Sequence, residues 1–147
     1  MSLARSAHNT LLQIGDGATP SENFVTVAEV KDIGGPGLAA ATEDVTSHDS
    51  AGWREHIVTI KEGGEVTFDV NFIGDSTQGP DGGLWEDFVE GNLRNFQILF
   101  DTANNDQVDF GAYVTGYEMA APVEGVLSAA ITLTISGAVE WDNWVAP

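Results

Sequence analysis

Apolar and polar residues alternate through much of the chain. In residues 65–73, Val66, Phe68, Val70 and Phe72 fall on one face of an extended segment, and mainly polar residues fall on the other. Similar apolar rows occupy alternate positions in residues 94–101, 108–114 and 127–135. A period of two is typical of strands that bury one face. The pattern therefore predicts these strands, with weaker candidates at residues 10–14 and 24–30.

Turn-forming residues separate the expected strands. Glu62, Gly63 and Gly64 lie between a candidate strand at residues 56–61 and the one at 65–73. Glycine supplies the positive φ that tight hairpins need. Residues 103–106 and 121–125 separate the later strands in the same way. These spacings predict an antiparallel meander with local strand pairing.

One segment has helical spacing. Its apolar residues recur at i, i+1, i+4 and i+5, and they are Leu84, Trp85, Phe88 and Val89. Asp81 is the expected N-cap and Gly91 the expected C-cap. We expect a short helix at about residues 81–91 whose apolar stripe packs on the sheet. The predicted fold is mainly β, a β-sandwich or barrel with one short helix, in a single domain over residues 1–147.

A long interval at about residues 34–54 lacks a clear pattern. It starts with the sequence Gly-Gly-Pro-Gly at residues 34–37, continues with a polar stretch, and ends near Trp53. Long loops without structure of their own are uncommon in compact domains and usually serve a function or are mobile. We expect a long protruding loop here.

The charge balance excludes several functions. The 147 residues contain 5 Lys and Arg and 23 Asp and Glu, for a formal net charge of −18. Such a chain cannot neutralise a phosphate backbone or adhere to an anionic membrane surface. No apolar run approaches the 18 residues of a membrane span, and residues 1–12 lack the apolar stretch of a secretory signal. The absence of cysteine excludes disulfides, thiolate metal sites and thiol nucleophiles.

Candidate chemical groups have ordinary explanations. His48, Asp49 and Ser50 are the residue types of a hydrolase triad, but consecutive side chains point in different directions and do not form its hydrogen-bonded line. Glu86 and Glu90 are spaced i, i+4, which is more typical of a solvated helix face than of a catalytic dyad. We therefore predict no catalytic and no cofactor-binding residues, and no enzyme.

Metal sites are not expected either. The histidines His8, His48 and His56 lack the spacing of a zinc site. The acidic and amide residues of the predicted turn lack the spacing of a calcium loop; they are Asp101, Asn104, Asn105 and Asp106.

The polar faces of the predicted strands form a broad surface of hydroxyl and acidic groups. It includes Glu65, Thr67, Asp69, Asn71, Ser128, Thr132 and Thr134. One interpretation is an ordinary solvated sheet face. The other is the wall of a water-filled bore that several subunits share, as in a large barrel.

Several segments together carry a family resemblance. They are residues 30–37, 44–55, 64–68, 84–88, 110–117 and 130–137, and the most specific is Asp-Val-Thr-Ser-His-Asp-Ser at 44–50. Over roughly residues 24–137 the chain resembles the tail tube (major tail) proteins of long-tailed bacteriophages and of phage-derived tail-like particles. The resemblance implies a β-sandwich with one helix that assembles into hexameric rings, and these stack into a tube for DNA passage.

The resemblance also implies roles for particular residues. The long loop corresponds to an inter-ring arm, with interface positions Asp44, Thr46, Ser47, His48, Asp49, Ser50 and Trp53. The hydroxyl and acidic residues named above become candidates for the lumen wall. The implied partners are other copies of the chain and the tape measure, tail terminator and baseplate or initiator proteins. DNA would pass without tight binding, no cofactor or membrane is implied, and the protein would reside in the virion tail after synthesis in the bacterial cytoplasm.

Other functions stay open at this point. A monomeric β-sandwich binding module, for a carbohydrate or as an adhesin, with or without calcium, would also explain the strands and an exposed Trp53. A small hydrolase would use Glu86 or Asp87. A ring protein that caps the tube and a secretion-system tube protein are closer alternatives. Rings or tubes in electron micrographs of the purified protein would separate these possibilities.

Overall fold

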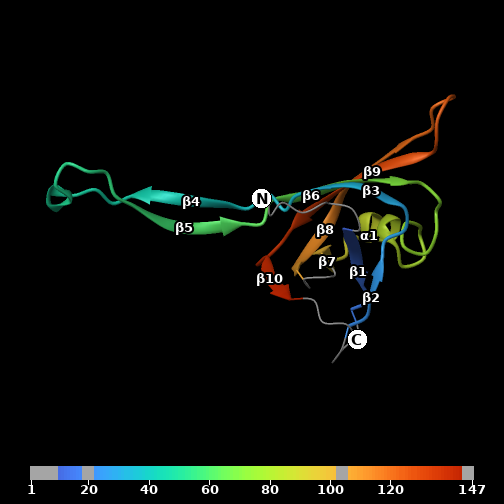
Figure 1. The fold of residues 1–147 in the computed structure, drawn as a ribbon, viewed down its shortest axis with the longest axis horizontal. Coiled ribbons are helices and arrows are strands. Elements are labelled where there is room, and N and C mark those ends of the chain that lie inside the picture. Colours follow the sequence, from blue (N-terminus) through green and yellow to red (C-terminus); the bar gives the residue numbers. More distant parts are fainter. Residues whose placement is uncertain (1–9, 18–21, 102–105, 144–147) are drawn as a thin grey trace, which may run out of the picture.

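The computed structural model describes residues 10–17, 22–101 and 106–143 (Figure 1). These residues form a β-rich body with one α-helix, and a long hairpin leaves the body on one side. In chain order the elements are β1 (Leu11–Gly15), β2 (Phe24–Thr26), β3 (Val30–Gly34), β4 (Ala39–Asp44), the 3-10 helix η1 (His48–Ser50), β5 (His56–Glu62), β6 (Glu65–Asn71), α1 (Leu84–Glu90), β7 (Arg94–Asp101), β8 (Asp106–Ala120), β9 (Ser128–Ile135) and β10 (Glu140–Asn143). The prediction of a mainly β fold with one short helix is confirmed.

The body is one antiparallel sheet in the order β2-β1-β7-β8-β9-β6-β3, with β10 also paired to β8. The 15-residue strand β8 is central to it. Residues 106–112 of β8 pair with β7 on one edge, and β10 and β9 follow one another along the other edge. The sheet therefore has two halves that share β8, and the predicted β7–β8 and β8–β9 hairpins are confirmed.

A single apolar core joins the two halves of the sheet. The alternating residues predicted from the sequence supply most of it: Val66, Phe68 and Val70 from β6, Phe96 and Ile98 from β7, Val108, Phe110, Ala112 and Val114 from β8, and Ala129, Ile131 and Leu133 from β9. Leu12, Ile14, Val27 and Leu84 complete the cluster. Burial of the alternate apolar residues on one face of β8 fixes the register, because a one-residue slip would turn every apolar side chain outward.

The interval predicted as a long loop is mostly a hairpin. β4 pairs with β5 in antiparallel register from Ala39 and Glu62 at the base to Asp44 and His56 near the tip. We call residues 38–62 the arm. The predicted hairpin between residues 56–61 and 65–73 is wrong, because β5 pairs with β4 while β6 pairs with β3 and β9. Gly63 and Gly64 lie where the chain leaves the arm and enters the body.

The helix is shorter than its pattern predicted. It runs from Leu84 to Glu90 with Gly83, and not Asp81, as its N-cap. Gly91 adopts the left-handed conformation at the C-cap, as expected. Of the apolar stripe only Leu84 is buried in the core, whereas Trp85, Phe88 and Val89 are exposed. The expected packing of the whole stripe on the sheet is therefore wrong. In the part of the chain that the structure describes, no helix is long and apolar enough to cross a membrane.

Candidate assembly surfaces

The arm contributes nothing to the core. Every residue of β4 and β5 is exposed, including Ile57, Val58 and Ile60, and Ile60 keeps 66% of its surface in solvent. Figure 1 shows the hairpin standing clear of the body along its whole length. An isolated two-stranded hairpin is marginally stable in water, and solvent-exposed apolar rows of this kind usually mark an interaction surface. The arm therefore has the character of a segment that another molecule covers.

Hydrogen bonds close the tip of the arm into a defined shape. Thr46 N–H donates to Asp44 Oδ1 at 2.8 Å, and Glu55 N–H donates to Thr46 Oγ1 at 2.8 Å. Ser47 and Ser50 form a reciprocal cap of η1, in which Ser47 N–H donates to Ser50 Oγ at 3.0 Å. These bonds hold Trp53 at the surface with 78% of its area exposed.

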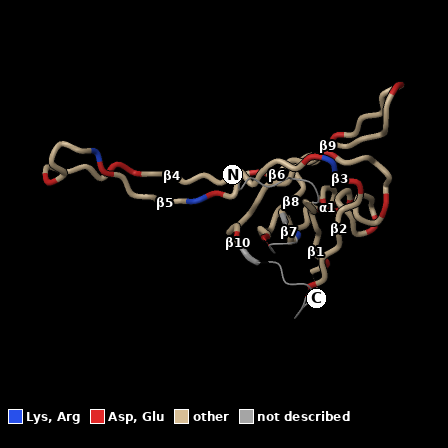
Figure 2. The backbone as a smooth tube through the Cα atoms, in the orientation of Figure 1, with Lys and Arg blue, Asp and Glu red and all other residues tan. Residues whose placement is uncertain are grey.

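One ion pair lies at the arm tip. Arg54 Nη1 lies 3.0 Å from Asp44 Oδ2, and both side chains are exposed. The hydrogen bonds from Thr46, and to a lesser extent the Arg54 guanidinium, hold the pKa of Asp44 below its ordinary value. Figure 2 shows both basic and acidic positions on the arm, whose residues 38–62 contain two cations, Arg54 and Lys61, and five acids, Glu43, Asp44, Asp49, Glu55 and Glu62. The arm is thus net acidic, and Arg54 and Lys61 are its only cations.

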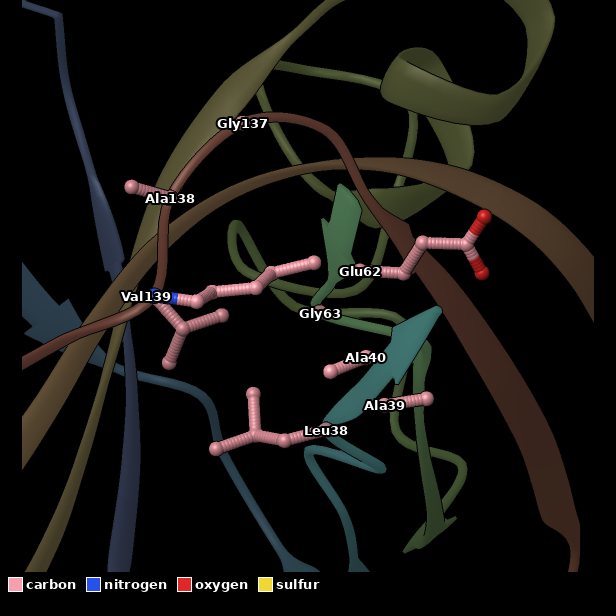
Figure 3. A pocket seen from close by; sticks show the side chains of 9 residues that line it. Leu38, Ala39, Ala40, Glu62, Gly63, Gly137, Ala138 and Val139 are labelled. Carbon is pink, nitrogen blue, oxygen red and sulfur yellow. The ribbon is translucent and has the colours of Figure 1, made fainter. Parts of the chain in front are cut away.

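Glycines allow close backbone approach at the root of the arm. A Cβ on Gly64, whose φ is +73°, would lie 2.3 Å from the carbonyl oxygen of Gly37. A Cβ on Gly63 would lie 2.5 Å from Ile135 Cγ2 and 2.8 Å from Val139 Cγ2. An open groove of about 500 Å³ lies here between the arm and the segment that follows β9 (Figure 3). Close packing at these glycines fixes where the arm leaves the body.

The face of the sheet opposite the core is polar. On β6 and β9, Glu65 pairs with Thr134, Thr67 with Thr132 and Asn71 with Ser128. Asp69 lies on the same face of β6, opposite Ala130. The hydroxyls of Thr115 and Thr134 are 2.9 Å apart and continue the surface onto β8. The structure thus brings all the lumen candidates together on one face.

The sheet has unpaired edges. β2 and β3 end the strand order, and neither has a second strand partner among the residues that the structure describes. β3 carries Lys31 and Asp32, both exposed, which discourages unspecific pairing. Such an edge can accept a strand from another chain.

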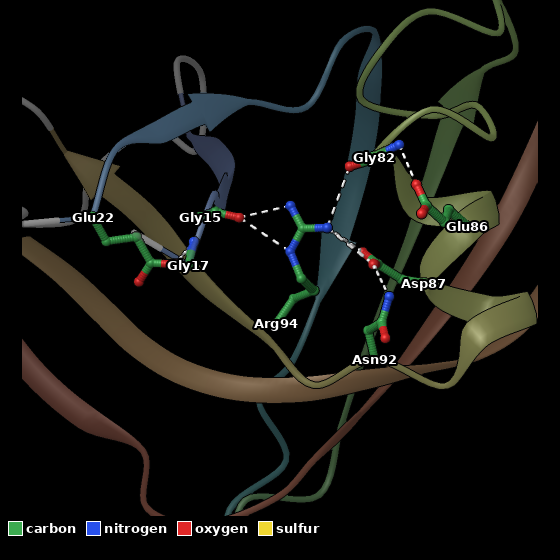
Figure 4. A network of polar contacts seen from close by, with 8 residues as sticks. All are labelled: Gly15, Gly17, Glu22, Gly82, Glu86, Asp87, Asn92 and Arg94. Carbon is green, nitrogen blue, oxygen red and sulfur yellow. Dashed lines mark hydrogen bonds and ion pairs between the residues drawn. The ribbon is translucent and has the colours of Figure 1, made fainter. Parts of the chain in front are cut away.

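A buried ion pair positions α1 and the loop before it (Figure 4). Arg94 Nη1 lies 2.9 Å from Asp87 Oδ1, and Arg94 Nε and Nη2 donate to the Gly15 carbonyl at 3.1 and 2.7 Å. Arg94 Nη1 also donates to the Gly82 carbonyl at 3.2 Å. Burial raises the pKa of Asp87, while the charge and hydrogen bonds of Arg94 oppose that rise. The pair therefore joins β1, the helix entry and β7.

The acidic residues considered for hydrolysis make contacts within the fold. Asp87 is paired with Arg94, and Glu86 Oε2 accepts a hydrogen bond from Gly82 N–H. Ser50, one of the predicted interface residues, is buried under the arm tip and supports the tip by accepting a hydrogen bond from Ser47 N–H. The other predicted interface residues lie together at the exposed tip: Asp44, Thr46, Ser47, His48, Asp49 and Trp53. Asn104 and Asn105, considered for calcium, lie outside the described residues.

Sequence reasoning missed part of the candidate surface. The apolar residues of β5 and the exposed side of α1 were assigned to an internal sheet and to core packing. Their exposure could not be read from spacing, because a strand or helix covered by another subunit has the same period as one covered by its own chain.

A folded body with unpaired strand edges, one polar sheet face and an uncovered apolar arm is typical of a subunit of a larger protein assembly. The model of the lambda phage tail tube protein family matches residues 14–142. The chain belongs to this family, and its role is that of a structural protein of a phage-type tail. The resemblance read from the sequence is confirmed.

Solved structures agree with this assignment. A chain in the tail of an empty gene transfer agent particle, refined with C6 symmetry, is 22% identical with a TM-score of 0.74, covering 95% of this chain and 99% of that one. The SPP1 tail tube protein is 14% identical with a TM-score of 0.66, over 93% of this chain and 78% of that one. A chain of the anti-feeding prophage baseplate is 11% identical with a TM-score of 0.65, over 97% and 98%. Among curated proteins, none matches this chain.

Proposed function

We propose that six copies of this chain form a ring, that rings stack into a tail tube, and that DNA passes through the lumen. The uncovered arm is the observation that carries this proposal, because its apolar residues need a neighbour that the chain itself does not provide. The C6 symmetry of the similar gene transfer agent tail supports the number six. We assign the contact between rings to the arm, with its tip residues as interface positions.

Within a ring, we assign the contact between subunits to the sheet edges. The free edge of β3 would pair with a strand of the next copy, so that the polar faces of β6 and β9 form a continuous barrel wall. Closure of a barrel removes exposed strand edges. The lumen would then present the acids and hydroxyls described above to the DNA.

The charge of the chain supports passage without binding. Carboxylates on the wall repel DNA phosphates, and the Debye length of roughly 8 Å at physiological salt confines this repulsion to the region near the wall. A wall of this kind offers DNA no cationic sites to hold it. We propose a purely structural role without catalysis, with tape measure, terminator and baseplate proteins as further tail partners.

Electron microscopy of the concentrated protein tests this function. We expect rings and tubes from the full chain. A variant in which residues 41–60 are replaced by a two-residue Asn-Gly turn should keep a folded body, because the removed segment contributes one buried residue, Ser50, and none of the core. This variant should form no stacked tubes. A full chain that stays monomeric and binds a carbohydrate would instead support the binding-module alternative.

Charge reversal tests the lumen assignment. Glu65→Lys and Asp69→Lys should leave tubes intact, because both side chains are exposed on the polar face, but should slow genome ejection from particles that carry them. Glu90→Lys, at the exposed end of α1 and away from the polar face of the sheet, serves as a comparison of the same charge reversal. Unchanged ejection, with the replaced residues mapped to the outer wall, would refute the assignment.

A further inference from the structure

An apolar pocket lies beside α1, on the part of the body away from the arm. Its volume is about 270 Å³, and its walls come from the segment after β6, from α1 and from β8. The lining side chains include Phe72, Pro80, Trp85, Tyr117 and Met119. Trp85 and Met119 are exposed at its mouth. The pocket therefore offers apolar surface that the body leaves uncovered.

The pocket is held open by hydrogen bonds. Gln78 is fully buried and uses its whole amide: Nε2 donates to the Ala28 and Asn71 carbonyls at 2.8 and 3.1 Å, and Oε1 accepts from the N–H groups of Ile73 and Gly74 at 2.9 and 3.2 Å. Tyr117 Oη donates to the Gln78 carbonyl at 3.1 Å. The ring of Trp85 meets the Tyr117 ring edge to face, with centroids 5.4 Å apart. A site fixed in this way loses little entropy when a side chain enters it.

Three acidic residues, which we call the rim, adjoin in sequence the residues that line the pocket. Asp75, Asp81 and Glu86 each lie next to a lining residue in the sequence, namely Gly74, Pro80 and Trp85. Figure 2 shows acidic positions along α1 and along the segment between β6 and α1. An occupant that combines an apolar side chain with an adjacent cation would match both the walls and the rim.

The arm tip carries that combination. Trp53 is the exposed aromatic residue of the tip, and Arg54 beside it is an exposed cation whose Nη1 lies 3.0 Å from Asp44 Oδ2. We propose that Trp53 of one subunit occupies the pocket of another copy, with Arg54 against the acidic rim. This inference rests on the proposed tube function and names the surface that receives the arm.

The placement of the two surfaces favours this partner. The arm points away from α1, so a chain cannot fill its own pocket (Figure 1). A contact between two different surfaces of identical chains leaves one arm and one pocket free at the ends, and so it propagates. A stack of rings requires a contact of this kind, whereas a self-complementary contact would end at a dimer.

Photo-cross-linking tests the contact directly. Met119→benzoylphenylalanine places a photoreactive group at the mouth of the pocket in assembled tubes. Trypsin cuts after Lys31 and Arg54, so the arm tip is released on a peptide of residues 32–54. We expect this peptide to be attached to position 119 and a ladder of covalent multimers to appear on denaturing gels. Attachment only to other peptides would overturn the proposal.

Substitutions of Trp53 test how much the proposed contact contributes to the free energy of assembly. Trp53→Ala should raise the protein concentration needed for tube assembly on the order of 30-fold, the effect of a central aromatic anchor, without changing the melting temperature of the unassembled chain. Trp53→Phe should recover most of the loss. Assembly of Trp53→Ala at the wild-type concentration would overturn the proposal.

A charge swap tests the rim. Arg54→Glu and Asp81→Lys should each weaken assembly, and the double variant should assemble better than either. An effect confined to the Asp44–Arg54 pair within the arm would not be rescued by a change on another element. No rescue would therefore overturn the assignment of the rim. Tubes with arm tips bound elsewhere would leave the tube function intact, whereas a chain that stays monomeric at all concentrations and salt levels would overturn both.

Discussion

Replacing Arg94 by methionine tests the central polar contact of the body. Methionine keeps the length and apolar stem of the side chain but removes the guanidinium, with its hydrogen bonds to the Gly15 and Gly82 carbonyls. Asp87, which is 1% exposed, then keeps only a long contact of 3.5 Å from Asn92 Nδ2. A buried carboxylate that loses its cation costs about 3–5 kcal/mol of unfolding free energy.

The loss should be large in a melting experiment and should depend on pH. For a domain of this size, 1 kcal/mol corresponds to roughly 2–4 °C, so we expect Arg94→Met to lower the melting temperature by about 10 °C. Without Arg94 the pKa of Asp87 rises further, because burial is no longer opposed. Acidification protonates the orphaned carboxyl, and the difference from the wild type should therefore shrink as the pH falls toward 4.

Urea unfolding, followed by tryptophan fluorescence on dilute protein, measures the effect. The double variant Asp87→Leu with Arg94→Met is the control, because replacing both partners removes the uncompensated charge. We expect it to be more stable than Arg94→Met alone. A loss under about 1 kcal/mol in the single variant, or a double variant as unstable as the sum of the single changes, would refute this account of the pair.

The other predictions concern charge, the arm and titration. Because each chain carries −18, added salt should promote tube assembly, and light scattering across a salt series would detect the opposite trend. Gly64→Ala should lower the unfolding free energy by well over 1 kcal/mol, since its Cβ meets the Gly37 carbonyl in addition to the strained φ. Gly91→Ala is the matched control in the body, with φ +70° and open space around the added Cβ, and equal losses in both variants would contradict the close-packing argument. In carboxyl NMR titrations Asp44 should titrate below 3.8 and Asp87 above it, and the reverse order would be inconsistent with their surroundings. Accordingly, the stabilising contribution linked to Asp44 is lost as pH falls through its folded pKa, and that linked to Asp87 is lost as pH rises through its own.

The strands and their buried faces were predictable, because they follow from local alternation. Val66, Phe68 and Val70 point into the core as their spacing indicated, and the acids and hydroxyls between them share the opposite face. The β7–β8 and β8–β9 pairings also followed from short connections. Each of these features depends on residues that are neighbours in the sequence.

The arm was not predictable in the same way. Gly63 and Gly64 looked like a hairpin turn, but here they allow close approach to Ile135 and Gly37 from distant parts of the chain. The stripe on α1 looked like core packing, but the helix is short and only Leu84 reaches the core. Periodicity shows which side of an element is apolar. It does not show whether the same chain or another copy covers that side.

The independence of the arm has a practical consequence for mutational screening. No arm residue belongs to the apolar core, so changes along the hairpin leave the cooperative unfolding of the isolated body almost untouched. A thermal-shift survey of the purified chain would score substitutions such as Ile60→Asp as harmless. Under the proposed arm contact, only an assay on polymers would reveal the damage, because conventional stability screens do not register changes in this hairpin.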